Sequence, residues 1–443
     1  MLKTLFRFSF SIFKLLVNYL KMKKLVLGLA AIALIILVVS SLSSELPSYE
    51  PERDYLDLEE ALVKEFIFAK DSSVIELPEG HFLFSQSLSL DNKKHLTIRG
   101  KGMDKTVLSF KGQKSGAEGI KITNSQHITL EDFTIEDAAG DNLKVSETDT
   151  LIIRRIRSAW TGEVSEENGA YALYPVLSTN VLIEQSEVIG SSDAGIYVGQ
   201  SDKVIIRNNK AFFNVAGVES ENSTNVEIYE NEVFNNTSGL LIFNLPGLTM
   251  SGGYVKAYNN RVYDNNLSNF AVKGSIVSAV PKGTGVIVMA TKDVTLFDNE
   301  IKDHKTSNMS IVSYELFALE QEDAELSDEA EDRGLRGIDA DFKNDLDYNP
   351  YSGRVYAYEN RFENRFLLPT FSNDFGLLWA FKNGFKIPDI TYDGIIADDG
   401  KLQDQAHLIC LKNNEGASFA YLDAANDFEG FTTDVNMFEC EGE

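Results

Sequence analysis

The feature that most constrains the fold is a repeat of about 22 residues between Asn180 and Val262. Each unit has a β-branched run, a polar turn and a second short apolar run that follows a glycine. The glycines Gly195, Gly217 and Gly239 are spaced 22 residues apart. A fixed period of this length is typical of repeat architectures, and apolar runs of about 3–5 residues are too short for a helical solenoid. The sequence therefore predicts a parallel β-helix, in which one strand of each coil stacks on the next to form each face.

A recurrent asparagine marks the bend after one of these strands. The valines at 181, 204, 226, 255, 294 and 355 are followed five residues later by Ser186, Asn209, Asn231, Asn260, Asn299 and Asn360. Asparagine tolerates the left-handed backbone of a tight bend, and stacked amides hydrogen-bond to one another as a ladder. Each valine and the residue two positions on face the interior together, because side chains alternate along a strand. We therefore predict that these asparagines stack along one axis of the β-helix.

Changes in composition divide the chain into four parts. Residues 1–44 read as a signal or anchor segment, and residues 45–55 as a polar linker. Residues 56–366 are predicted to form an all-β, single-stranded parallel β-helix of about nine or ten coils, with an N-terminal capping helix and an acidic insertion at 314–352. Residues 367–443 are predicted to form a C-terminal cap. Insertions in a solenoid lie along one edge, so we expect them to frame a binding groove.

The N-terminal part predicts export. Leu25–Ser41 is an apolar run that follows Lys23 and Lys24, which is the arrangement of an export signal. Its 17 residues are near the lower limit for crossing a bilayer, so a retained membrane anchor and a cleaved signal are both open, and the anchor is favoured. Lysines on the amino side alone place the rest of the chain outside the cytoplasm. Met22 opens a more ordinary signal than Met1, and either methionine is a candidate start.

The charge of the chain excludes some partners. The net charge is −26, and because residues 1–44 hold six basic and no acidic residues, the remainder carries −32. Such a surface argues against nucleic acid and against wide contact with anionic lipid, and it repels polyanions. Among small cofactors, the sequence indicates none that is required. We expect a monomer.

Two cysteines, Cys410 and Cys440, lie near the C-terminus. In an exported chain they are free to pair, which closes a loop of about 30 residues and stabilises the fold by roughly 3 kcal/mol. No CxxC motif is present, so the sequence gives no sign of thiol-redox or zinc-finger chemistry.

Several segments carry a resemblance to known proteins. They are the VIELPEG and IRGKG segments after the first helix, the SDAGIYVGQS, NSTN and NNTSGLLIFNLPG coils, and the LICLKNNEGASFAYLD and FEC tail. Over residues 55–443 the chain resembles the right-handed parallel β-helix proteins of the pectin-lyase-like superfamily. It is especially similar to a bacterial envelope family known as parallel β-helix repeat-containing proteins. The resemblance implies a right-handed β-helix, and for function it implies polysaccharide lyases, hydrolases, epimerases or non-catalytic adhesins.

One face of the predicted β-helix displays side chains that are suited to chemistry. In strands of the form Gly-apolar-X-apolar, X alone points outward. On successive coils, X is Lys121, Lys144, Tyr171, Tyr197, Glu219 and Leu241, with Asp141 and Asp193 beside them. Coils about 4.8 Å apart match the pitch of a sugar chain, and aromatic rings flanked by acids and bases suit a carbohydrate groove. We predict Lys144, Tyr197 and Glu219 as catalytic residues. Lys121, Tyr171 and Asp193 are predicted to bind substrate.

Three functions fit this face. A lysine or tyrosine base next to a second cation would remove the proton α to a uronate carboxylate, as in a lyase or epimerase. Asp193 and Glu219 would act as a glycoside hydrolase pair if their carboxyl groups lie roughly 5–10 Å apart. The same residue types are also common on exposed strands, in which case the solenoid is a non-catalytic envelope or adhesion protein. We predict an exported, membrane-tethered protein that binds and processes polysaccharide, with a lyase or epimerase favoured over a hydrolase.

A separate acidic run gives a candidate metal site. Asp339, Asp341, Asp345 and Asp347 alternate within the large insertion. Ca²⁺ prefers several carboxylate ligands, but the run lacks the glycine and the glutamate of an EF-hand loop. Ca²⁺ is therefore an optional cofactor in this prediction, and a solvated acidic loop is the alternative.

Overall fold

The computed structural model describes residues 46–443 apart from 57, 321–326, 328–334, 340 and 441–443. The predicted signal or anchor segment at 1–44 lies outside the described residues, as does most of the acidic first half of the large insertion. Residues Ser48–Glu443 form one compact unit. Within the described part of the chain, no helix is long and apolar enough to cross a bilayer.

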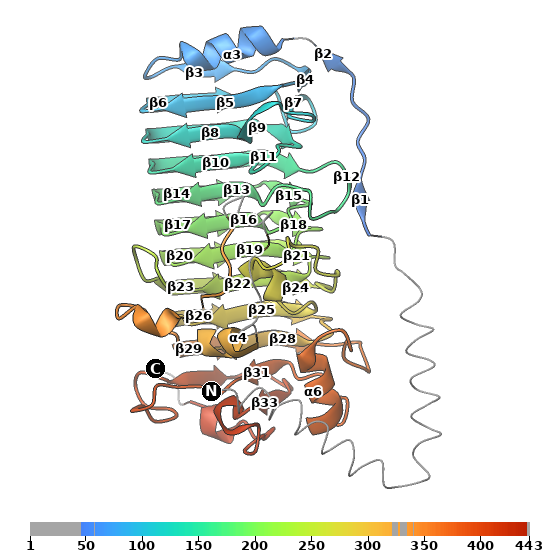
Figure 1. Ribbon diagram of the computed structural model, residues 1–443, viewed down its shortest axis with the longest axis vertical. Coiled ribbons are helices and arrows are strands. Elements are labelled where there is room, and N and C mark those ends of the chain that lie inside the picture. The colour runs from blue at the N-terminus through green and yellow to red at the C-terminus, as the bar shows by residue number, and fades with distance from the viewer. Residues whose placement is uncertain (1–45, 57, 321–326, 328–334, 340, 441–443) are drawn as a thin grey trace. The chain divides into compact units, whose positions relative to one another are not determined.

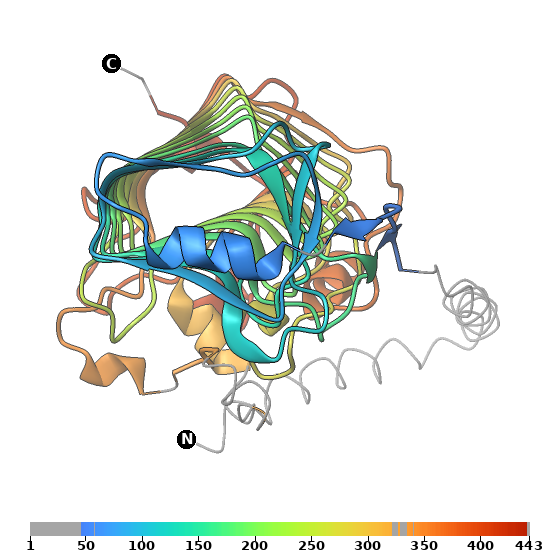
Figure 2. The same ribbon diagram turned by 90° about the horizontal axis from the view of Figure 1, so that it is seen from above.

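Parallel strands stack coil on coil into three walls, which are seen from the side in Figure 1 and along the stack in Figure 2. Wall 1 is an eleven-stranded sheet. It contains β5 (Gln86–Asp91), β8 (Ser115–Thr123), β10 (Leu143–Ser146), β13 (Tyr171–Val176), β16 (Ala194–Gly199), β19 (Ala216–Glu221), β22 (Ser238–Phe243), β25 (Thr284–Met289), β28 (Ser307–Val312), β31 (Ile390–Tyr392) and β33 (Phe419–Tyr421).

Walls 2 and 3 meet at the corner that carries the recurrent asparagines. Wall 2 contains β3 (Val74–Glu76), β6 (Lys94–Arg99), β14 (Thr179–Glu184), β17 (Asp202–Arg207), β20 (Thr224–Tyr229), β23 (Gly253–Tyr258), β26 (Lys292–Phe297), β29 (Gly353–Tyr358) and β32 (Ile409–Lys412). Wall 3 contains β2 (Tyr55–Leu56), β4 (Gly80–Leu83), β7 (Thr106–Ser109), β15 (Glu187–Ile189), β18 (Lys210–Phe212), β21 (Glu232–Phe234), β24 (Arg261–Tyr263), β27 (Glu300–Lys302) and β30 (Arg361–Glu363). The long strands β9 (Gln126–Glu136) and β11 (Asp149–Ala159) run through the corner and belong to both walls.

The predicted asparagine ladder is confirmed. The side-chain amide of each asparagine donates to the Oδ1 of the asparagine one coil further on, at 2.8 to 3.2 Å, from Asn209 through Asn231, Asn260, Asn299 and Asn360 to Asn414. Ser186 closes the series, because its backbone N–H donates to Asn209 Oδ1 at 2.9 Å. The valines and isoleucines predicted to face inward, such as Val204 and Ile206, are fully buried. The ladder therefore holds successive coils in register.

A second ladder was not predicted. Asn214, Asn236 and Asn265 follow the first-ladder asparagines by five residues, and each amide donates to the next at 2.9 to 3.0 Å. His304 takes the following position, where its Nε2 lies 3.1 Å from the Asn265 amide. Burial lowers the pKa of His304 to about 4. The imidazole is therefore neutral at ordinary pH and serves as a hydrogen-bonding rung of the ladder.

The two ends of the stack differ from the predicted boundaries. The capping helix α3 (Glu59–Ile67) buries Leu62 and Phe66 over the first coils. The region predicted as a linker is held by β1 (Ser48–Tyr49), which pairs antiparallel with β12 (Gly162–Glu163). At the other end the stack continues past residue 366, since β31, β32 and β33 extend walls 1 and 2 into the region predicted as a cap.

Helices outside the walls lie in the insertions and the C-terminal region. They are α4 (Tyr314–Glu320), α6 (Asp374–Lys382) and the 3₁₀-helices η1 (Ile276–Ala279), η2 (Phe342–Asn344), η3 (Ala424–Asn426) and η4 (Asn436–Phe438). Cys410 in β32 forms a disulfide with Cys440, with their Cα atoms 5.4 Å apart. The disulfide ties the last residues of the chain to the end of wall 2.

The substitution Asn260→Ala tests the ladder. It removes the acceptor of two bonds from Asn231 and the donor to Ile228 O and Asn299 Oδ1, leaving buried polar groups unsatisfied. We expect the free energy of unfolding to fall by about 3 kcal/mol or more. The control is Asn208→Gly, because Asn208 is exposed in the same corner and glycine keeps its left-handed backbone. Equal thermal unfolding midpoints for the two variants would contradict a structural role for the ladder.

Candidate functional site

The outward row of wall 1 is the one predicted, with one correction. In register, Lys121 lies beside Lys144, and Lys144 lies beside Tyr174 rather than Tyr171. The row then continues through Tyr197, Glu219, Leu241 and Ile287. The predicted place of Tyr171 in this row was wrong, because it was counted from Gly169. The insertion at 160–169 places that glycine three positions before the place that Gly195 holds one coil later.

The two lysines form local ion pairs. Lys121 Nζ lies 2.9 Å from Glu118 Oε1, and Lys144 Nζ lies 3.6 Å from Asp141 Oδ2. Lys144 also sits over the ring of Tyr174, 4.7 Å from its centroid. Burial raises the pKa of Asp141 to about 6, although Lys144 opposes the rise. Each lysine is therefore matched by an acid three residues earlier, so this part of wall 1 carries little net charge.

Three tyrosine rings pack together on the next coils. The centroids of Tyr171, Tyr174 and Tyr197 lie 4.5 to 4.8 Å apart. The Tyr197 hydroxyl donates to Glu221 Oε1 at 2.9 Å. This ring crosses over Gly199, where a Cβ atom would lie only 2.2 Å from the phenol oxygen. Burial raises the pKa of both Tyr171 and Tyr197 well above the ordinary value for tyrosine. Both phenols are therefore protonated at neutral pH, which leaves the Tyr197 hydroxyl able to donate to Glu221.

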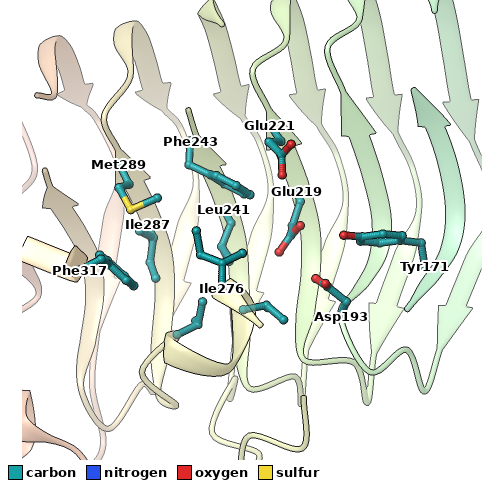
Figure 3. A pocket seen from close by; sticks show the side chains of 12 residues that line it. Tyr171, Asp193, Glu219, Glu221, Leu241, Phe243, Ile276, Ile287, Met289 and Phe317 are labelled. Carbon is teal, nitrogen blue, oxygen red and sulfur yellow. The ribbon is translucent and has the colours of Figure 1, made fainter. Parts of the chain in front are cut away.

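Three carboxyl groups gather beyond the tyrosines. Asp193 lies immediately before β16, and Glu219 and Glu221 occupy the two outward positions at the end of β19. They are 5%, 2% and 6% exposed. Figure 3 shows the carboxyl groups of Asp193 and Glu219 and the hydroxyl of Tyr171 directed toward one space. In the part of the chain that the structure describes, the Glu219 carboxyl has no hydrogen-bond partner.

Electrostatics favours a proton on this cluster. Burial raises the pKa of Glu219 well above its ordinary value, and the neighbouring Asp193 and Glu221 raise it further. Burial also raises the pKa of Glu221, while the Tyr197 hydrogen bond and Arg336 oppose the rise. Like charges held close together in a low-dielectric site cannot all ionise. Glu219 is therefore the carboxyl of this group best suited to hold a proton near neutral pH.

The acids form one end of a pocket on the outer face of wall 1. It is lined by Tyr171, Asp193, Glu219, Glu221, Leu241, Phe243, Ile276, Val277, Val280, Ile287, Met289 and Phe317. Wall 1 supplies the floor, while η1 and α4 supply the cover. Ile276 N–H donates to Arg336 O at 2.7 Å, which ties η1 to the second half of the large insertion. Residues from two of the insertions thus line this pocket together with wall 1, and a binding groove at this place stays a prediction.

The predicted site residues separate into two groups. Tyr171, Asp193 and Glu219 line the pocket, and Tyr197 contacts it through Glu221. Lys121 and Lys144 lie on earlier coils and do not line it. Tyr174 and Glu221 were not predicted from the sequence. The strand GVESE carries a second acid two positions after Glu219, and strand alternation alone places both outward.

The acidic run in the large insertion caps turns. Asp339 Oδ1 accepts the Asp341 N–H at 2.8 Å, and Asp345 Oδ1 accepts the Asp347 N–H at 3.1 Å. Asp345 Oδ2 accepts the Gly247 N–H at 2.8 Å. Across the residues that the structure describes, no group of three or more histidine, cysteine, aspartate or glutamate side chains is arranged to hold a metal ion.

Comparison with known proteins agrees with this geometry. The model of the family described as the right-handed beta helix region matches residues 96–247. With the parallel sheets that run on beyond this range, the fold is a right-handed parallel β-helix. The handedness and fold class expected from the resemblance are thereby confirmed. A search of curated protein sequences finds no significant match to this β-helix.

Solved structures give further similarity in fold. The A-module of a mannuronan C-5 epimerase from Azotobacter vinelandii is 14% identical, with 83% of this chain and 92% of that chain covered and a TM-score of 0.46. A surface adhesin of Streptococcus pneumoniae is 12% identical, with 82% and 83% covered and a TM-score of 0.47. At this level of similarity, neither protein indicates what this β-helix binds or catalyses.

The pKa of Glu219 gives a stability prediction. Between the pKa of an unfolded glutamate and the raised pKa of folded Glu219, the folded protein holds a proton that the unfolded chain releases, so stability falls as the pH rises. Glu219→Gln removes this loss. We expect its thermal unfolding midpoint to exceed that of the parent protein at about pH 8 and to match it at about pH 4. The exposed Glu415→Gln serves as the control, and a Glu219→Gln variant that is less stable than the parent at high pH would contradict the raised pKa.

Proposed function

We propose that this protein is an extracytoplasmic glycoside hydrolase that binds a glycan along wall 1 and cleaves one of its glycosidic bonds at the carboxyl cluster. The observation that carries the proposal is Glu219, a 2% exposed carboxyl in a pocket, with a pKa raised by burial and by two neighbouring acids. Glycosidases need one carboxyl that is protonated near neutral pH beside a second that is ionised. Asp193 is the second carboxyl in this proposal.

The proposed reaction divides the roles between these acids. The Glu219 carboxyl donates its proton to the glycosidic oxygen while the bond from that oxygen to the anomeric carbon breaks. The Asp193 carboxylate either attacks the anomeric carbon directly or takes a proton from the attacking water. Water supplies the hydroxyl that ends on the anomeric carbon, and the leaving group keeps the donated proton. Glu221 accepts the hydrogen bond from the Tyr197 hydroxyl. In this proposal its negative charge helps to keep the proton on Glu219.

The lyase or epimerase alternative is less well supported. It needs a base that is unprotonated near neutral pH and a cationic neighbour that lowers the pKa of that base. Lys144 is paired with Asp141, and the pKa of Tyr197 is raised rather than lowered. The buried carboxyl cluster also disfavours a uronate, because it repels a substrate carboxylate.

Two observations support a location outside the cytoplasm. The disulfide between Cys410 and Cys440 is of the kind that persists in oxidising compartments. The apolar run Leu25–Ser41 after Lys23 and Lys24 fits an export signal or a membrane anchor. Tethering to the membrane through this run is part of the proposal, and detergent-dependent extraction of the full chain from membranes would test it.

A panel of neutral and acidic polysaccharides, together with alkyl and aryl glycosides of neutral sugars, tests the hydrolase. We expect a new reducing end from at least one neutral glycan or glycoside, without the ultraviolet absorbance of an unsaturated uronate. Glu219→Gln and Asp193→Asn should each lower the rate by at least about 100-fold while binding of that glycan persists. The control is Glu227→Gln, at an outward position of wall 2. An unsaturated product would favour the lyase, and no binding or cleavage across the panel would favour a non-catalytic solenoid.

A further inference from the structure

We infer that the glycan cleaved at this site carries an apolar aglycone, which occupies the half of the pocket beyond the acids. The inference rests on the proposed function and names the class of its substrate. It concerns a neutral sugar that is bonded, across the cleaved linkage, to an uncharged alkyl or aryl group.

The lining of the pocket changes sharply from coil to coil. One coil after Glu219, the outward row of wall 1 becomes Leu241, and then Ile287. Every lining residue in this half is apolar: Leu241, Phe243, Ile276, Val277, Val280, Ile287, Met289 and Phe317. Figure 3 shows the labelled side chains of this set on the side of the pocket away from Tyr171, namely Leu241, Phe243, Ile276, Ile287, Met289 and Phe317. Outward positions of a solenoid usually face water, so this apolar half marks a departure from that pattern.

This half of the pocket is unsuited to a second sugar. Each sugar hydroxyl that enters must give up hydrogen bonds to water, and none of the eight side chains can replace them except through the weak acceptor of Met289. The backbone groups of β22 and β25 are already paired with neighbouring strands of wall 1. An unsatisfied hydroxyl makes the binding free energy less favourable, whereas burying an apolar group makes it more favourable. An alkyl or aryl group therefore fits where a sugar ring does not.

The acids limit the charge of the occupant. Asp193, Glu219 and Glu221 lie in the same buried pocket, where a carboxylate or phosphate on the ligand would be repelled strongly. A fatty acid or a phosphate-bearing lipid is therefore excluded close to the cluster. Glu219 and Leu241 are register neighbours on adjacent strands, about 4.8 Å apart. The apolar group would thus lie on the leaving-group side of the glycosidic oxygen that Glu219 protonates.

Titration with paired glycosides tests the inference without requiring turnover. The probes are the n-hexyl and methyl glycosides of glucose, galactose, mannose and N-acetylglucosamine, measured by calorimetry with the full chain carrying Glu219→Gln. For at least one sugar, we expect the hexyl glycoside to bind at least about tenfold more tightly than the methyl glycoside. Equal affinities for the two series, or no binding of either, would overturn the inference.

Matched variants test whether the preference for hexyl glycosides arises in the apolar half of the pocket. Ile287→Asn places a polar group on the floor of the apolar half and should abolish the preference for the hexyl glycosides. Ile205→Asn changes an outward isoleucine on wall 2 and should leave it intact. Val280→Ser polarises the cover instead of the wall, and it replaces Ile287→Asn if circular dichroism shows that this variant is unfolded. A preference that survives both pocket variants would overturn the assignment.

The outcome is separable from that of the hydrolase proposal. Cleavage of an unsubstituted glycan in the panel, combined with equal hexyl and methyl affinities, overturns the aglycone and leaves the hydrolase standing. A hexyl preference that Ile287→Asn abolishes, combined with no cleavage of any glycan or glycoside, supports the apolar subsite and overturns the hydrolase.

Discussion

The structure depends on keeping every coil in register with the one before it. Parallel backbone pairing supplies most of the hydrogen bonds, but a parallel ladder by itself permits slippage by two residues without loss of alternation. The buried asparagines remove that freedom. The Asn231 amide and backbone N–H meet one acceptor, Asn260 Oδ1, so a shifted coil would leave several buried polar groups without partners. The insertions can then vary in length without disturbing the walls.

A fixed register has a direct consequence for the site. It brings residues from separate coils to adjacent outward positions, so that Tyr197, Glu219 and Leu241 become neighbours although about 22 residues of chain separate each from the next. The walls alone would leave these side chains in water. The insertions that carry η1 and α4 cover them, and this cover converts a row of surface residues into a buried pocket with shifted pKa values.

The fold was largely predictable from the sequence because it follows from local periodicity. The 22-residue spacing, the alternation of apolar residues and the asparagine at a constant offset each act within one coil. The second ladder was predictable by the same rule, since Asn214 and Asn236 share the offset, but His304 obscured the series. Counting failed where an insertion interrupts a coil, as it did when Gly169 was used to align Tyr171.

The site was less predictable, and the reason is physical. Outward orientation is a property of a strand, so the sequence was sufficient to place Glu219 on the correct face. Burial is a property of the whole structure, because it depends on which insertion folds over which coil. Lys144 was assigned a catalytic role from its position in the row, yet it is paired with Asp141 and is not among the residues that line the pocket.

By itself, the amino-acid sequence determined that this chain winds into coils and which side chains face outward, because both follow from spacing along the backbone. Only the tertiary structure decided which of the outward side chains are buried. Desolvation depends on segments that are distant in the sequence, and it raises the pKa of Glu219. The same segments complete a pocket in which three acids lie beside an apolar surface.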